Sequence, residues 1–193
     1  MIISIIGKSG SGKSTISKML ESYSDKIIKL DVDKISHKTL EIQEVKNEIK
    51  NKIGSVFDER NNIDRKKLRG IVFNNHEKLN ILNNISWYYM EVMIDEFLNM
   101  NKDKIIIIDW LLTPLTKYFE MSDLKILVAA SFETRKNRVL KRDLITEEEF
   151  YKRDKSAPNL DLYNYNYVID NNYNICESEV KKIYDKSIIH RKF

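Results

Sequence analysis

The chain has 193 residues, of which 42% are hydrophobic and 32% are charged, and its formal net charge is +4. This length and composition fit one globular core, with or without an insertion, and exclude a chain that is disordered throughout. The charge is too small and too evenly mixed to indicate a nucleic-acid or membrane-binding protein, but it suits a small anionic substrate.

Short apolar runs alternate with helical patterns along most of the chain. Residues 2–6 form the first run, and Ile16, Met19, Leu20 and Tyr23 then follow at the spacing of one helix face. Short β-branched runs are typical of strands that are buried on both faces of a parallel sheet. Such runs predict strands at residues 2–6, 27–30, 105–108, 124–130 and 167–169. We therefore expect an α/β fold with about five parallel strands flanked by helices.

Residues 34–100 interrupt this alternation. Apolar side chains there recur at near-helical spacing, most clearly between residues 79 and 98. We interpret residues 34–100 as a helical insertion that separates the second predicted strand from the third. Residues 1–33 and 101–193 then form the core domain.

Residues 7–15 match the phosphate-loop pattern G-x-x-x-x-G-K-[ST]. They follow a predicted buried strand and open an amphipathic helix, which is the context that the pattern requires. Glycines let backbone N–H groups wrap around a phosphate, and a helix N-terminus favours negative charge. The alternative is a Gly- and Ser-rich turn that precedes a helix, but the context favours binding of a nucleoside triphosphate. The residues that we expect to bind it are Gly7, Gly10, Ser11, Gly12, Lys13, Ser14 and Thr15.

Two residues of this loop and one later carboxylate have more specific expected roles. Lys13 would reach the β and γ phosphates, and Ser14 would ligate Mg²⁺. Asp109 ends the third predicted strand, where many phosphate-loop proteins place a Walker-B carboxylate near Mg²⁺. The alternative for Asp109 is an aspartate that ends the strand in a turn.

A pair of carboxylates, Asp31 and Asp33, follows the second predicted strand. Alternation along an extended segment would point both side chains in the same direction, at the sheet edge that carries the phosphate loop. A phosphoryl transferase needs a carboxylate to accept the proton of the attacking hydroxyl. The alternative is that one of the two caps the N-terminus of the next helix.

Beyond the phosphate loop, three segments resemble the dephospho-CoA kinase family. Residues 31–37, Asp-Val-Asp-Lys-Ile-Ser-His, are similar to the family's D-x-D-x-I-x-H, and residues 63–73 contain its D-R-x-x-L-x-x-x-V-F. Arg-Val-Leu-Lys-Arg-Asp at residues 138–143 is followed by Val-Ile-Asp-Asn at residues 168–171. With the phosphate loop, these segments span nearly the whole chain in the family's order.

The resemblance implies a P-loop kinase fold with a helical substrate-binding insertion and a short lid at about residues 142–162. It implies transfer of the ATP γ-phosphoryl group to the ribose 3′-hydroxyl of dephospho-CoA, the last step of coenzyme A biosynthesis. Asp33 is then the expected base, Lys13 and Arg138 stabilise phosphate charge, and Arg142 assists nucleotide binding.

We expect four residues to bind the acceptor, namely Asp31, His37, Arg65 and Arg69. For His37 the alternative is a packed or exposed side chain without a binding role. For the basic cluster around Arg65 it is a solvated face, which is the usual role of a charge run.

Two other functions fit the phosphate loop. One is a related kinase for another nucleoside, nucleotide or sugar acceptor. The other is a nucleotide-binding switch or RNA-associated protein without a small acceptor. A GTPase is disfavoured because no guanine-reading Asn-Lys-x-Asp segment follows the fourth predicted strand. The paired Asp31 and Asp33, together with the helical insertion, favour an acceptor site over a switch.

The single cysteine, Cys176, allows neither an intrachain disulfide nor a cysteine-ligated zinc site. The longest apolar runs are far shorter than the ~20 residues of a membrane-spanning helix, and the N-terminus lacks the features of a signal peptide. We therefore expect a cytoplasmic protein that is a monomer or a weak homo-oligomer, with no nucleic-acid or membrane partner.

Overall fold

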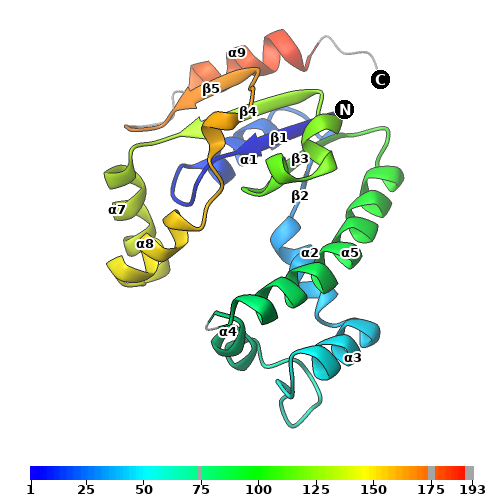
Figure 1. Cartoon of the computed structure of the whole chain (residues 1–193). Helices are drawn as coiled ribbons and strands as arrows, with labels where there is room; N and C mark the ends of the chain where they lie inside the picture. The colour runs from blue at the N-terminus through cyan, green and yellow to red at the C-terminus, as the bar shows by residue number, and fades with distance from the viewer. Residues whose placement is uncertain (74, 174–176, 190–193) are drawn as a thin grey trace. The chain divides into compact units, whose positions relative to one another are not determined.

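The computed structural model describes residues 1–73, 75–173 and 177–189, so Cys176 lies outside the described residues. The chain divides into two compact units (Figure 1). The first combines Met1–Leu30 with Asn101–Phe193, and the second is Asp31–Met100.

The first unit is built on one parallel sheet. Its described strands are β1 (Ile2–Ile6), β2 (Ile27–Leu30), β3 (Ile105–Asp109), β4 (Leu124–Ala129) and β5 (Tyr167–Asp170). They are arranged in the order β2-β3-β1-β4-β5, and each neighbouring pair is parallel. The five predicted strands and the α/β fold class are confirmed. The bounds differ by one residue at the ends of β3, β4 and β5.

Helices cover both faces of this sheet, which explains why its strands are apolar on both sides. On one face, α1 (Lys13–Glu21) and α9 (Glu177–Ser187) contribute to a core that includes the fully buried Ile5 and Ile107. On the other face, Ile6 packs with Phe119 and Leu160. Phe119 belongs to α6 (Lys117–Met121), which follows the short 3₁₀ turn η1 (Thr113–Leu115), and Leu160 belongs to η2 (Leu160–Leu162).

Two further helices follow β4. They are α7 (Phe132–Asp143) and α8 (Glu147–Lys155). Phe132 packs against the fully buried Phe150, with 5.3 Å between ring centroids. Thr146 and Glu149 form a capping box at the start of α8, because each side chain accepts a hydrogen bond from the other's main-chain N–H.

The second unit is helical, as its apolar spacing predicts. It contains α2 (Val32–Thr39), α3 (Gln43–Lys52), α4 (Arg65–Phe73) and α5 (His76–Met100). The first three all pack against α5, and their core includes Val45, Ile49, Leu68 and Ile85. No helix in the described residues is long and apolar enough to cross a membrane.

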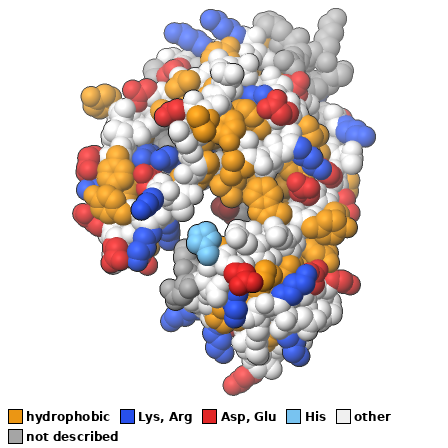
Figure 2. Space-filling model, viewed as in Figure 1, with side chains coloured by type: hydrophobic (Ala, Val, Ile, Leu, Met, Phe, Trp, Pro, Cys, Tyr) orange, Lys and Arg blue, Asp and Glu red, His pale blue; other side chains and the backbone are white. Residues whose placement is uncertain are grey.

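Charged side chains of both signs are interspersed over the face shown in Figure 2. Blue and red side chains alternate there and do not merge into one large basic area. This distribution agrees with the small net charge of +4.

Replacing Ile107 tests the sheet core. Ile107→Ala should lower the free energy of unfolding by about 2–5 kcal/mol, because this central side chain is fully buried, whereas Ile107→Val should cost about 0.5–1.5 kcal/mol. Val168→Ala is the control, since Val168 on β5 is 58% exposed and its loss should change stability by less than about 0.5 kcal/mol. Urea unfolding measures all three, and equal effects at both positions would contradict this packing.

Candidate active site

The phosphate loop joins the end of β1 to the start of α1. Gly12 precedes α1 with a φ of 100° and a ψ of 15°, a left-handed conformation that glycine adopts at little cost. It offers no side-chain cap, and the first turn of α1 carries no acidic residue. No carboxylate of the helix itself therefore neutralises the positive end of its dipole, which favours an anion at this position.

Close packing fixes the middle of the loop. Gly10 has a φ of 80°, and a Cβ added there would lie 2.6 Å from the carbonyl oxygen of Arg135 and 2.9 Å from Val139 Cγ2. Both neighbours belong to α7. The loop therefore lies directly against this helix, and only glycine fits at residue 10.

A second contact comes from the residue after β5. The side-chain amide of Asn171 donates a 2.6 Å hydrogen bond to the carbonyl oxygen of Ser11. The main-chain N–H of Asn171 donates a 2.8 Å hydrogen bond to the carbonyl oxygen of Ala129. Ser11 itself is only 1% exposed. Asn171, itself 4% exposed, is thus a buried support of the loop.

A buried carboxylate lies beside the first turn of α1. Asp109 Oδ2 accepts hydrogen bonds from Ser14 Oγ at 2.9 Å and from Ser17 Oγ at 3.3 Å. Lys29 Nζ on β2 lies 3.1 Å from the same oxygen, and the Asp109 side chain is only 4% exposed. The structure thus brings together Ser14 and Asp109, the two residues predicted to bind a metal.

The two arginines predicted to contact nucleotide differ in their surroundings. The Arg138 guanidinium donates to the carbonyl oxygens of Gly10 at 3.4 Å and Tyr173 at 3.0 Å, so it lies at the phosphate loop. Arg142 instead donates two hydrogen bonds to Asp143, at 2.6 and 3.1 Å. These bonds lower the pKa of Asp143 below its usual range and raise the pKa of Arg142.

The expectation that Asp31 and Asp33 share an extended segment is wrong. Asp31 is the N-cap of α2, where its side chain accepts a 3.0 Å hydrogen bond from Lys34 N–H, and Asp33 lies in the first turn of the helix. Short polar side chains favour this capping position over continued strand. Asp33 and His37 are both exposed and four residues apart, so they share a face of α2.

Arg65 and Arg69 occupy one face of α4 in the same way, four residues apart and exposed. Asp64 precedes this helix and accepts hydrogen bonds from the main-chain N–H groups of Lys66 and Lys67, at 3.0 and 3.1 Å. Both hydrogen bonds lower the pKa of Asp64, and the bond from Lys67 has the larger effect. Asp64 therefore has a capping role that anchors the start of the arginine face.

Sequence reasoning missed the contacts of Lys29 and assigned no role to Asn171. Lys29 is the one charged residue of its strand, Ile-Ile-Lys-Leu, and a lone charge in a buried strand is a usable signal for a buried partner. Asn171 directly follows β5, where polar residues at the carboxyl end of a parallel strand point to a ligand site.

Replacing Gly10 tests the fit of the phosphate loop. Gly10→Ala should weaken nucleoside triphosphate binding at least tenfold and cost about 1–3 kcal/mol of stability, because its Cβ would clash at a left-handed φ. Calorimetric titration and urea unfolding measure the two effects.

Gly70→Ala is the matched control. Gly70 lies inside α4, and nothing approaches within 4 Å of a Cβ added there. This change should stabilise the protein by up to about 1 kcal/mol, since alanine is the better helix former. Normal triphosphate binding by Gly10→Ala would contradict the packing described for the loop.

Comparisons with known proteins identify the family of the chain. The family described as "Dephospho-CoA kinase" matches residues 1–177. The chain is 36% identical to the dephospho-CoA kinase of Fusobacterium nucleatum over 95% of each chain, and 34% identical to that of Aquifex aeolicus over 95% of this chain and 96% of the relative. A crystal structure of a Thermus thermophilus protein shares the fold, with a TM-score of 0.80, 22% identity, and coverage of 100% of this chain and 98% of that one. The chain belongs to the dephospho-CoA kinase family.

Proposed function

We propose that the protein transfers the γ-phosphoryl group of ATP to the ribose 3′-hydroxyl of dephospho-CoA, which gives coenzyme A and ADP. The observation that carries this function is the phosphate loop with Asp109 at its side, in a chain that matches the family over residues 1–177. In the reaction, the 3′-oxygen bonds to the γ-phosphorus, the bond to the bridging oxygen of ADP breaks, and the hydroxyl proton passes to a base.

The phosphate side of the reaction is assigned to the loop and α7. Lys13 stabilises the charge that shifts toward the β–γ bridging oxygen, and the N–H groups around Gly12 hold the β-phosphate. Thr15 belongs to the first turn of α1 and Gly7 begins the loop, which supports their inclusion in the nucleotide site. Arg138 is the α7 residue best supported, because its guanidinium already bonds the loop carbonyl of Gly10.

Arg142 is retained as a nucleotide-binding residue on different grounds. Its guanidinium is 64% exposed and bound to Asp143, so it would have to exchange that carboxylate for a phosphate. Arginine forms charge-assisted, bidentate bonds with both carboxylate and phosphate oxygens. The helix α8 and the residues around it, about 142–162, are proposed as the short lid.

A magnesium ion is the expected cofactor besides ATP. The donor set fits this ion, since Mg²⁺ takes oxygen ligands and is usually held by one or two carboxylates together with substrate phosphates and waters. Ser14 Oγ and the Asp109 carboxylate, 2.9 Å apart, would hold it. When bound, the ion neutralises charge on the β and γ phosphates.

Asp33 is proposed as the base that accepts the hydroxyl proton. Asp31 Oδ1 is already occupied by the N–H of Lys34, while Asp33 is exposed on the first turn of α2, on the face that also carries His37. A capping carboxylate is a poorer base because its hydrogen bond stabilises the ionised form. Asp31 and His37 remain proposed acceptor contacts.

Asparagine substitutions separate the two carboxylates. Asp33→Asn should lower kcat by roughly 10²–10⁴ and leave KM for ATP almost unchanged, because only the proton acceptor is lost. Asp31→Asn should keep kcat near the wild-type value, since asparagine caps a helix as well as aspartate does. A coupled assay of ADP release measures both variants. A severe loss in Asp31→Asn with a mild one in Asp33→Asn would exchange their roles.

The helical insertion, residues 34–100, is proposed as the acceptor-binding domain. Dephospho-CoA is long and carries a 5′-pyrophosphate set back from the reacting 3′-hydroxyl. Arg65 and Arg69 offer two exposed guanidinium groups on one face of α4, which suits a pyrophosphate. Contacts remote from the reacting atoms can lower the barrier as well as raise affinity.

A panel of acceptors tests the substrate assignment. Dephospho-CoA should be phosphorylated with a kcat/KM at least ~10²-fold above that of adenosine, AMP, CMP or shikimate. Phosphorylation of another acceptor without measurable turnover of dephospho-CoA would leave the ATP site intact and replace the proposed substrate.

The double variant Arg65→Gln, Arg69→Gln should raise KM for dephospho-CoA about tenfold or more and leave KM for ATP unchanged. The control is Lys181→Gln with Lys182→Gln, which removes two positive charges from α9. Equal effects of the two double variants would indicate a general charge effect instead of a pyrophosphate site.

The cytoplasmic location and the monomeric or weakly associated state stay predictions.

A further inference from the structure

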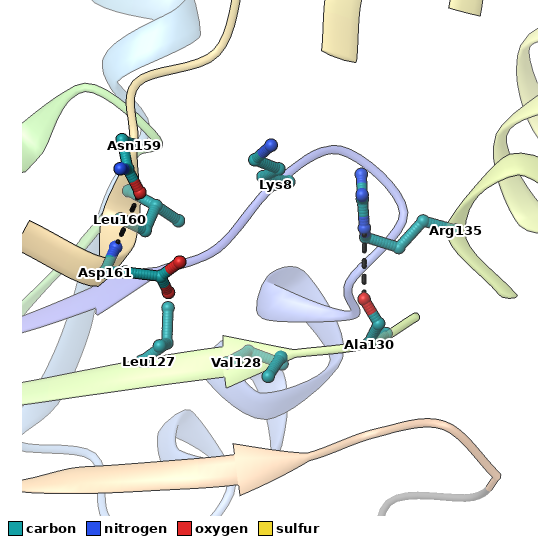
Figure 3. Close-up of a pocket in the computed structure, with 9 residues that line it drawn as sticks. Lys8, Leu127, Val128, Ala130, Arg135, Asn159, Leu160 and Asp161 are labelled. Carbon is teal, nitrogen blue, oxygen red and sulfur yellow. Dashed lines mark hydrogen bonds between the residues drawn. The ribbon is translucent and has the colours of Figure 1, made fainter. Parts of the chain in front are cut away.

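A cavity of about 240 Å³ lies beside the phosphate loop, within the first unit (Figure 3). The end of β4 forms its floor, and Leu160 and its two neighbours line one side. Two basic side chains, Lys8 from the loop and Arg135 from α7, also line it. The complete lining is Lys8, Leu127, Val128, Ala129, Ala130, Arg135, Asn159, Leu160 and Asp161.

Lys8 is the first residue after Gly7, so it is part of the phosphate loop. Its carbonyl oxygen accepts a 3.1 Å hydrogen bond from Ser11 N–H, which fixes its main chain in the turn of the loop. Its side chain is 31% exposed and projects from the loop at the cavity (Figure 3). The loop thus carries a second lysine ammonium besides that of Lys13, at the opposite end of its sequence.

The counter-charge of Lys8 is Asp154 of α8, and this carboxylate is shared. Arg135 Nη1 donates a short hydrogen bond to Asp154 Oδ1, and Arg135 Nε donates to Ala130 at 3.2 Å. Lys8 Nζ lies 3.7 Å from Asp154 Oδ2, which is longer than a hydrogen bond. Arg135 therefore holds Asp154 firmly, whereas Lys8 is bound only by a weak, partly exposed ion pair.

We propose that Lys8 is a second phosphate-binding lysine of the loop and that Asp154 is its partner only while the site is empty. On ligand binding, the Lys8 ammonium exchanges Asp154 for a non-bridging phosphoryl oxygen. Asp154 stays neutralised because Arg135 keeps its hydrogen bond, so the exchange leaves no unpaired carboxylate. A phosphate is also the stronger partner, since it carries more negative charge than a carboxylate.

This inference rests on the proposed function, which supplies two sources of phosphate. One is the γ-phosphate of ATP, and the other is the 5′-pyrophosphate of dephospho-CoA. The chemistry is the same for both, and comparing ligands separates them. Because binding is measured apart from turnover, a wild-type protein that fails to phosphorylate dephospho-CoA would refute the proposed function without deciding the role of Lys8.

The test compares Lys8→Gln, Lys8→Arg and a control, Lys136→Gln. The Lys136 side chain is 14% exposed, and its ammonium lies 2.9 Å from Glu133 within α7 and 4.0 Å from Glu147 of α8. It does not line the cavity. Its loss therefore removes one charge and a contact with α8 without touching the phosphate loop.

Calorimetry measures the Kd of ADP, a non-hydrolysable ATP analogue and dephospho-CoA for each variant. Lys8→Gln should raise the Kd of one ligand about tenfold. A weaker affinity for the ATP analogue but not for ADP identifies the γ-phosphate as the partner of Lys8. A weaker affinity for dephospho-CoA alone identifies the pyrophosphate. Lys8→Arg should restore most of the affinity, and Lys136→Gln should match the wild type.

The proposal is overturned if Lys8→Gln binds all three ligands within twofold of the wild type. It is also overturned if Lys136→Gln reproduces the losses, because the effect would then come from the packing of α7 against α8. A thermal unfolding midpoint for each variant shows that the proteins compared are folded.

Discussion

The phosphate loop keeps its shape through main-chain contacts that distant elements supply. Gly10 lies against the backbone of α7, and the carbonyl of Ser11 is held by Asn171 at the end of β5. The N–H of Ser11 closes a turn within the loop, and the carbonyls and the glycine supply its contacts with distant elements. Both supports come from strands and helices of the same unit, which makes the parallel sheet the frame of the site.

Charge balance is the second constraint at this sheet edge. The Asp109 side chain is nearly buried. The free-energy cost of burying its charge is offset by Lys29 and by the hydroxyls of Ser14 and Ser17. Asp154 is balanced in a similar way by Arg135. In both cases a carboxylate beside the loop has a basic partner from another element, so neither carboxylate is left unpaired where an anionic ligand would enter.

The strands and the loop could be predicted from the sequence because their signals are local. The run at residues 2–6 and the glycines after it need no distant partner to be interpreted. Asp31 was misjudged because strand alternation and helix capping compete at that residue, and capping prevailed. The bond between Lys29 and Asp109 spans 80 residues, and that between Asn171 and Ser11 spans 160. No periodicity encodes such pairs, so only the fold reveals them.

The outer strands of the described sheet, β2 and β5, are four residues each, shorter than the three strands between them. A short edge offers few unpaired main-chain groups to a neighbouring molecule, and lysine on an edge strand further discourages pairing with another chain. Lys29 is such a residue, since it lies on β2 while its ammonium is bound to Asp109. Lys29, which balances the buried carboxylate of Asp109, therefore also lies on an edge strand. A strand of another molecule would pair there if the chain aggregated during folding.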